Sequence, residues 1–457
     1  MTSFSIDLKP MDTYDVVVVG GGPSGCTAAI AVAREGKKTL LVEATGALGG
    51  MGTMGLVPAW CPFSDHEKII YRGLAEKIFR LSKAFVPSEP EDKLDWVAIQ
   101  SEELKRIYDD LVQEAGVSVL FNTLLCGAKA EDGRVDTLLL ANKEGLVACR
   151  GTVYIDCSGD ADLSVFAGAG FEKGDASGTV QPSTLCFVLG NVDTYAYQYT
   201  LKDRMRNINL DDDCVCVRMM KDPELDLIVD THFCNTMIAP GAVGFNAGHL
   251  FDVDATDPMQ VSKALQQGRK LAHQMLKGLK KYAPEAFANA YLAQTAPLMG
   301  IRESRRVICD YRLTVSDYLE RRSFPDEIGR NAYYIDIHHS LSELSAVKDG
   351  FFDPTQRYEH YGPGESHGIP YRCLTPKGLK NCLVAGRIIG SDPIVFGSIR
   401  VMPACLVTGE AAGLAAALAF DQEVVDVHAI NVHLLQERLI SYGGYLHKDQ
   451  DESNSLG

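Results

Sequence analysis

A valine-rich run that ends on glycines constrains this chain more than any other stretch. Residues 14–19 read YDVVVV, and Gly20 to Gly25 read GGGPSG. A short, continuous apolar run predicts a buried parallel strand. The small residues from Cys26 to Gly36 predict a helix directly after the glycines. We therefore expect a strand, a tight glycine loop and a helix at the start of the fold.

The glycine loop has the spacing G-x-G-x-x-G, which binds dinucleotides when it lies between a strand and a helix. Gly20 permits the tight turn, Gly22 lets a pyrophosphate approach the backbone, and Gly25 lets the helix pack close to the strand. Pro23 and Ser24 begin the expected helix, whose free N–H groups and dipole attract phosphates. The loop therefore predicts a dinucleotide site, and both NAD and FAD use such a loop.

An acid and a second glycine-rich stretch favour FAD. A strand expected over residues 38–42 leads to Glu43 and Ala44, and Glu43 stands where an acid holds ribose hydroxyls and repels a 2′-phosphate. The loop that follows reads ATGALGGMGTMG, and such a loop can wrap a cofactor longer than NAD. We expect Gly49, Gly50 and Thr53 to line it toward the isoalloxazine.

Several segments together resemble the FAD-dependent oxidoreductases of the glutathione reductase type, a group related to the flavoprotein component of heterodisulfide reductase. They are GGGPSG, LGGMGTMGLV, DCSGDAD, GIRESRRVICDYRLT and the C-terminal run from IPYRCLTPKGLKNCLVAGR to SIRVMPACLVTGEAAG. The resemblance implies non-covalent FAD as the redox cofactor. No second G-x-G-x-x-G follows a strand, so a dedicated NAD(P)H domain is not expected.

The resemblance also implies further FAD contacts. We expect Leu125 beside the adenine, Ser158 and Gly159 on the adenosine side, and Gly386 and Arg387 near the ribityl or pyrophosphate. A helix that begins near Pro403 is expected to point its N-terminus at the flavin pyrimidine, where its dipole favours negative charge. Arg400 adds a full charge there, and Met402 lies beside it.

The resemblance predicts an α/β fold with a discontinuous Rossmann-like FAD domain. Its two parts are expected over residues 1–165 and 370–450. An inserted substrate domain over residues 166–369 mixes predicted strands with a helix from about residue 257 to 284, which indicates a mixed sheet capped by helices. The polar tail, residues 448–457, is expected to be disordered.

The cysteines predict neither a metal site nor a disulfide framework. The chain has thirteen of them and no C-x-x-C pair, so it lacks the iron–sulfur motifs of the heterodisulfide reductase flavoprotein. Electrons must then be exchanged with a partner protein, a small molecule, oxygen or a nicotinamide that docks transiently.

Arg302 is the first candidate for binding substrate, because a guanidinium holds a carboxylate through two parallel hydrogen bonds. If residues 301–308 form a strand, Arg302 and Arg306 share one face and Arg305 takes the other. One face would serve the substrate or flavin and the other a structural ion pair. The alternative is that all three arginines are structural or solvated.

Histidines suit proton transfer near neutral pH. In YYIDIHHS, strand alternation places Asp336 and His338 on one face, so that the carboxylate could orient the imidazole. His249 lies in a turn beside Gly248 and is the other candidate. The alternative for each histidine is a structural role.

Together these features predict an enzyme that transfers a hydride between flavin N5 and a small organic substrate, with a carboxylate as one candidate. The alternatives are an electron-transfer subunit that works with a partner protein, and a flavin enzyme of the tRNA or thiazole modification type. The net charge of −16 opposes general binding to nucleic acid or membranes. No signal peptide pattern is present, so the cytoplasm is expected, and a homodimer is common for such enzymes.

Overall fold

The predicted strand, glycine loop and helix lie at the centre of the largest sheet. This computed structural model describes residues 8–86, 88–205, 213–340 and 358–446. Strand β1 (Lys9–Val19) leads through the glycines into α1 (Pro23–Arg34), and the chain returns along β2 (Thr39–Val42), which pairs in parallel with β1. The four valines of β1 and all of β2 are buried, which explains the apolar runs.

The main sheet runs in the order β3-β2-β1-β6-β5-β4, and β15 also pairs with β6. The added strands are β3 (Ser118–Leu120), β4 (Leu124–Glu131), β5 (Arg134–Asn142), β6 (Gly145–Asp156) and β15 (Cys382–Val384). The first part of β6 pairs antiparallel with β5, and its end pairs in parallel with β15. The C-terminal segment therefore completes a sheet that the N-terminal segment begins, which confirms the predicted α/β class. The exact domain boundaries stay a prediction.

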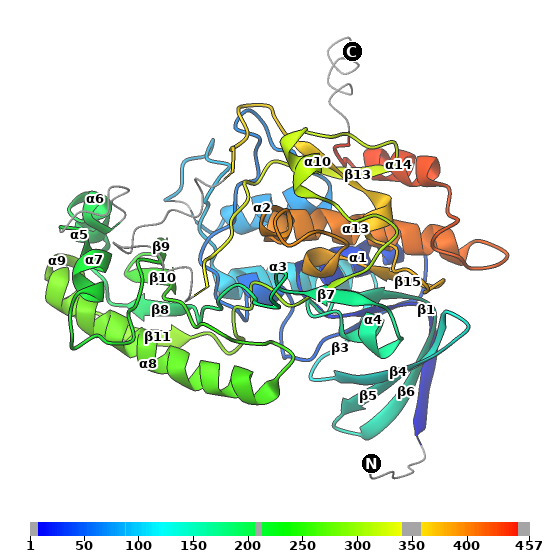
Figure 1. Cartoon of the computed structure of the whole chain (residues 1–457), viewed down its shortest axis with the longest axis horizontal. Helices are drawn as coiled ribbons and strands as arrows, with labels where there is room; N and C mark the ends of the chain where they lie inside the picture. Colours follow the sequence, from blue (N-terminus) through cyan, green and yellow to red (C-terminus); the bar gives the residue numbers. More distant parts are fainter. Residues whose placement is uncertain (1–7, 87, 206–212, 341–357, 447–457) are drawn as a thin grey trace.

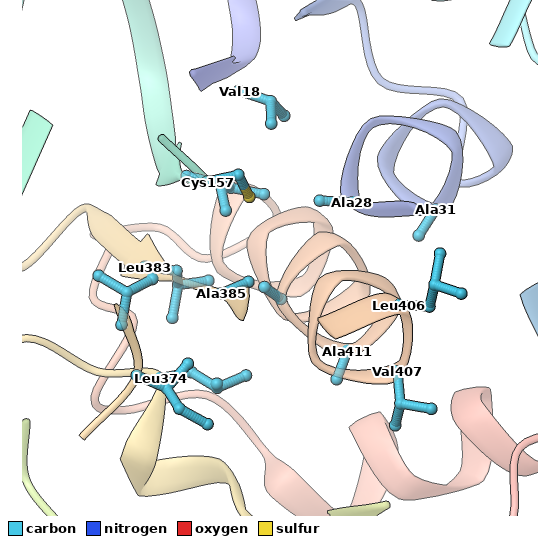
Figure 2. Packing of buried hydrophobic residues seen from close by; sticks show 14 of the residues in the cluster. Val18, Ala28, Ala31, Cys157, Leu374, Leu383, Ala385, Leu406, Val407 and Ala411 are labelled. Atoms are coloured by element: carbon cyan, nitrogen blue, oxygen red, sulfur yellow. The ribbon is translucent and has the colours of Figure 1, made fainter. Parts of the chain in front are cut away.

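Helix α13 (Met402–Phe420) packs so closely along α1 that glycines of α13 lie against the backbone of α1. A Cβ atom at Gly409 would lie 2.2 Å from the carbonyl oxygen of Ser24, and one at Gly413 would lie 2.3 Å from that of Ala28. Figure 2 shows Ala28 and Ala31 of α1 on the side that faces α13. The small residues of both helices are thus explained by their close approach.

In the described ranges α13 alone is long and apolar enough to cross a membrane, and 89% of its most apolar window is buried inside the protein. This burial makes α13 an internal helix of the fold.

A second sheet lies to one side of the first, with the long helix α8 along it (Figure 1). Its order is β11-β8-β10-β9, and all its pairings are antiparallel. The elements are β8 (Phe187–Gly190), β9 (Phe233–Ala239), β10 (Ala242–Ala247), β11 (Tyr291–Thr295) and α8 (Pro258–Tyr282). A separate hydrophobic cluster drawn from residues 185–301, together with Leu56, forms the core of this layer. The sheet and its helix agree with the predicted insert, but the sheet is antiparallel throughout rather than mixed.

Shorter elements complete the described chain. The helices are α2 (Leu74–Lys83), α3 (Ser101–Glu114), α4 (Asp162–Phe166), α5 (Thr194–Tyr199), α6 (Lys202–Met205), α7 (Val215–Met220), α9 (Pro284–Phe287), α10 (Val315–Leu319), α12 (Phe396–Ile399) and α14 (Val432–Ser441). There are also two antiparallel sheets of two strands each in the described residues. One pairs β7 (Phe171–Lys173) with β12 (Arg305–Val307), and the other pairs β13 (Glu327–Asn331) with β14 (His367–Pro370). The predicted tail, residues 448–457, lies outside the described residues.

Two expected strands differ from the structure. The strand expected over residues 301–308 is present only as β12, and residues 332–340 form no strand. Arg302, Glu303 and Ser304 are buried, and buried polar side chains need individually placed partners. These partners come from several segments rather than from a neighbouring strand. Arg302 therefore lies outside any strand, and the strand alternation predicted for it is wrong.

Gly409→Ala is expected to lower the free energy of unfolding by about 1–3 kcal/mol, because the new methyl group overpacks the contact between α13 and α1. Gly127→Ala is the matched control, since the nearest atom to its Cβ position, Cβ of Leu139, lies at 3.8 Å. Denaturant unfolding of both variants measures the difference. Equal effects at the two positions would contradict the close helix contact.

Glu410 of α13 holds the start of α2 and is expected to make stability depend on pH. Its Oε2 accepts a hydrogen bond from the N–H of Leu74 (2.8 Å), and burial raises its pKa to about 7. Because the unfolded pKa is about 4.3, burial of the ionised carboxylate costs stability. The fold is therefore most stable below that pH and loses stability as pH rises toward the folded pKa.

Glu410→Gln should therefore flatten the fall in unfolding free energy between about pH 4 and about pH 7. Denaturant unfolding at several pH values gives the comparison. Parallel curves for the variant and the native chain would refute the assignment.

Candidate functional site

The glycine loop before α1 leaves its backbone open to a phosphate. Gly20 has a φ of 96°, and a Cβ atom at Gly25 would lie 1.7 Å from the carbonyl oxygen of Gly20. At Gly22, no heavy atom of the described residues lies within 4 Å of the Cβ position. No described side chain caps the N-terminus of α1, where Pro23 occupies the first turn. N–H groups near Ser24 can therefore bind an anion, and the loop fits a pyrophosphate.

Glu43 ties the end of β2 to this loop. Its Oε2 accepts a hydrogen bond from the N–H of Gly21 (2.6 Å), and its Oε1 accepts one from the N–H of Thr45 (2.8 Å). Ala44 is exposed beside it. The acid therefore lies against the glycine loop, and its contact with a ribose stays a prediction.

The second glycine-rich stretch folds back onto the first. Gly49 donates its N–H to the carbonyl oxygen of Gly21 (2.8 Å), and a Cβ atom at Gly50 would lie 3.1 Å from Cα of Gly22. The Thr53 hydroxyl donates to the carbonyl oxygen of Leu48 (2.6 Å). Thr53 therefore uses its hydroxyl to hold this loop in shape.

Two residues from the C-terminal part of the chain, Gly386 and Met402, lie against the two glycine-rich stretches. Gly386 has a φ of 82°, and its Cβ position lies 2.6 Å from Oγ of Ser24. Met402 begins α13, and its Sδ lies 3.3 Å from the Cβ position of Gly52. Two predicted sets of cofactor residues, far apart in sequence, thus meet around one loop.

The remaining predicted cofactor residues lie at nearby strand ends. Arg387 donates hydrogen bonds to the carbonyl oxygens of Gly159 and Ile301, so its guanidinium joins the end of β6 to the inserted layer. The Ser158 hydroxyl donates to Oδ1 of Asp156 (2.7 Å). Leu125 is buried at the start of β4. Arg387 and Ser158 thus make their side-chain hydrogen bonds within the protein. The contacts of these residues and of Leu125 with a cofactor stay predictions.

The three predicted catalytic residues belong to one buried polar cluster. Nδ1 of His249 lies 2.9 Å from Oδ2 of Asp230, and its Nε2 lies 2.8 Å from Nδ1 of His338. Nε2 of His338 lies 3.4 Å from Oδ1 of Asp336, whose carboxylate is 3.3 Å from Nη2 of Arg400. The Asp336–His338 pairing that alternation suggested is present, although no strand carries it.

Arg302 lies next to this chain of contacts. It donates to the carbonyl oxygen of Pro182 (2.7 Å) and to Oγ1 of Thr184 (2.8 Å), and its Nη2 lies 3.2 Å from Nε2 of His232. The His232 ring stacks on that of His249, with centroids 4.2 Å apart. The cluster therefore combines two arginines, three histidines and two aspartates.

Burial and the opposing charges shift the acidity of these groups. Burial and the Arg302 guanidinium lower the pKa of His338 to about 3. Burial lowers the pKa of His249, against the raising effect of Asp230. Burial alone would raise the pKa of Asp336, but His338 and Arg400 hold it below its usual value. The histidines are therefore neutral at pH 7, and the carboxylate is charged.

Three buried polar atoms of this region have no hydrogen-bond partner among the described residues. They are Nε2 of Gln181, Nδ1 of His232 and Nε of Arg400. Gln181 contacts the cluster directly, because its Oε1 accepts the N–H of His338 (3.1 Å). Nε2 of Gln181 and Nε of Arg400 can only donate hydrogen bonds. The cluster therefore presents buried donors to a ligand that offers oxygen atoms.

The other two arginines of the motif are structural. Arg305 pairs with Asp162 and donates to the carbonyl oxygen of Asp160, and Arg306 pairs with Glu303. Asp230, His232 and Gln181 also belong to the cluster but were not among the residues predicted from the sequence. No spacing signal could have found them, because folding alone brings their segments to His338.

Known proteins resemble this chain over different lengths. The model of the FAD dependent oxidoreductase family matches residues 15–439. A digeranylgeranylglycerophospholipid reductase of Thermoplasma volcanium is 28% identical over 180 residues, which cover 35% of this chain and 42% of the reductase. A dihydrolipoyl dehydrogenase of Trypanosoma brucei brucei is 57% identical over 47 residues, 10% of each chain. The matched region thus spans less than half of each of these two relatives.

Among solved structures, a geranylgeranyl bacteriochlorophyll reductase-like protein of Thermoplasma acidophilum superimposes with a TM-score of 0.44 and 14% identity. The alignment covers 95% of this chain and 84% of the other.

Glu43→Gln is expected to weaken FAD binding about tenfold, because a hydrogen bond to a charged group contributes about 1.5–3 kcal/mol. Fluorescence titration of the apoprotein with FAD measures the dissociation constant. Glu131→Gln, at an exposed position at the end of β4, is the matched control. An unchanged dissociation constant for Glu43→Gln would remove Glu43 from the cofactor site.

Proposed function

Because the chain belongs to the FAD-dependent oxidoreductase family, we propose that it transfers a hydride between FAD and a small organic anion. The anion is a carboxylate held by Arg302 and Arg400. His338 and His249 exchange the proton that accompanies the hydride.

The observation that carries this proposal is the set of buried donors without partners around His338. Nε of Arg400 and Nε2 of Gln181 each have a hydrogen to donate and no acceptor among the described residues. A buried donor left unpaired costs about 1–3 kcal/mol, so a ligand rich in acceptors is favoured. Two guanidinium groups in one buried cluster favour an anionic ligand over a neutral one.

The contacts along the cluster give the proton a defined path. We assign the hydrogens from the contact network: Nδ1–H of His249 donates to Asp230, and Nδ1–H of His338 donates to Nε2 of His249. With both rings neutral, Nε2 of His338 has no hydrogen, and its contact with Asp336 is the longest of the three. Nε2 of His338 is therefore the atom that takes up a proton, which Asp336 then stabilises.

The cofactor would be held by the N-terminus of α1, Glu43 and the two glycine loops. When bound, FAD supplies the centre that accepts or gives up a hydride. The uncapped start of α13, with Arg400 just before it, favours negative charge nearby. Residues 54–58 link the glycine loop to the inserted layer, since the N–H of Leu298 donates to the carbonyl oxygen of Met54. This contact supports the proposal, because it joins the second glycine-rich stretch to the segment that leads to Arg302.

The test is an anaerobic screen of small carboxylates for bleaching of the flavin absorption. With a substrate found, Arg302→Gln should raise its dissociation constant about tenfold or more, since it removes a charge-assisted hydrogen bond. Arg269→Gln, at an exposed position on α8, is the matched control. An unchanged dissociation constant for Arg302→Gln would contradict the anion site.

His338→Gln should lower the rate of flavin reduction by about 10²–10⁴, the usual contribution of proton transfer by a side chain. Stopped-flow reduction at saturating substrate separates this effect from binding. A native rate in this variant would contradict the proton path. Reduction only by a protein donor, with every small molecule inert, would instead favour the electron-transfer subunit.

A further inference from the structure

We infer that His232, His249 and His338 form a binding site for a divalent transition metal ion such as zinc. One ring nitrogen from each residue lies within 4.8 Å of the others. Imidazole nitrogens are the ligands that zinc, copper and nickel share. The inference uses the residues of the proposed substrate site, but it does not depend on the reaction proposed there.

His249 and His338 face each other and supply two of the three nitrogens. Nε2 of His249 and Nδ1 of His338 are 2.8 Å apart, and a carboxylate lies behind each ring, from Asp230 and Asp336. Metal-bound histidines are commonly oriented by a carboxylate on the outer ring nitrogen. Here Nδ1 of His249 faces Asp230 and Nε2 of His338 faces Asp336, so both rings have such a carboxylate.

The hydrogens on the two rings are too few for the contacts that they make. With both rings neutral, two hydrogens serve three contacts, so either one carboxylate or the pair of facing nitrogens is left without a hydrogen. A metal ion between the facing nitrogens changes this, because each ring then carries its hydrogen on the outer side. Both Asp230 and Asp336 accept a hydrogen bond in that state.

His232 supplies the third nitrogen. Its Nδ1 has no hydrogen-bond partner among the described residues, and its ring already stacks on His249. Its Nε2 contacts Arg302, but Nη2 of Arg302 also lies 3.4 Å from Oδ1 of Asn246. The guanidinium therefore keeps an acceptor when the His232 ring turns toward a metal.

Three protein ligands leave a position of a tetrahedral zinc ion open. Two aspartates and two arginines balance in charge around the histidines, so a divalent ion adds a net positive charge that an anion in the open position would offset. The ion takes the same nitrogens that share a hydrogen bond in the proposed proton path. Metal binding and proton transfer therefore exclude each other.

The test is the metal content of the FAD-loaded full chain after equilibration with zinc and gel filtration. We expect one zinc ion per chain, which His232→Gln should abolish. Asp336→Asn should raise the zinc dissociation constant about 10- to 100-fold, the usual effect of losing a group that orients a ligand. His273→Gln, at an exposed position on α8, is the matched control. Flavin absorbance and circular dichroism check that each variant folds.

Absence of zinc in the native chain, or equal zinc in His232→Gln and His273→Gln, would overturn the site. Faster flavin reduction with zinc would overturn the exclusion of proton transfer, whereas slower reduction that a chelator reverses would support it. Zinc content is measured without any substrate, so a failure here and a failure of the proposed function remain distinguishable.

Discussion

The contact between α1 and α13 is the interaction on which the rest of the structure depends. Two glycines of α13 bring its backbone against α1, and the buried Thr27 hydroxyl of α1 donates to the carbonyl oxygen of Leu406 (2.8 Å). This contact fixes the start of α13 relative to the glycine loop. Arg400, just before α13, is thereby positioned beside Asp336, and the polar cluster follows from that placement.

The polar cluster lies where the two hydrophobic cores of the protein meet. Arg302 and His249 come from the inserted layer, whereas Arg400 belongs to the segment before α13. Because neighbouring apolar side chains exclude water, charges at this junction act on one another more strongly than at a surface. The large shift in the pKa of His338 is a consequence of this position.

Local patterns predicted the strand, glycine loop and helix at the start of the fold, because each glycine there has a local geometric reason. The helix of α8 was also predictable, since Asp257 caps it and its apolar residues repeat. The cluster was only partly predictable. Arg302, His249 and His338 were chosen for their chemistry, whereas Asp230 and His232 carry no local signal. Residues 332–340 alternate like a strand but form none, because buried polar groups there find partners outside a sheet.

The path of the chain has a consequence for how the protein is made. The glycine loop is synthesised first, yet its neighbours β15 and α13 begin at residues 382 and 402. Contacts between such distant segments form slowly. During synthesis, the apolar face of α1 therefore stays uncovered until nearly the whole chain has left the ribosome. A nascent chain that stops early would expose this face to aggregation or to chaperones.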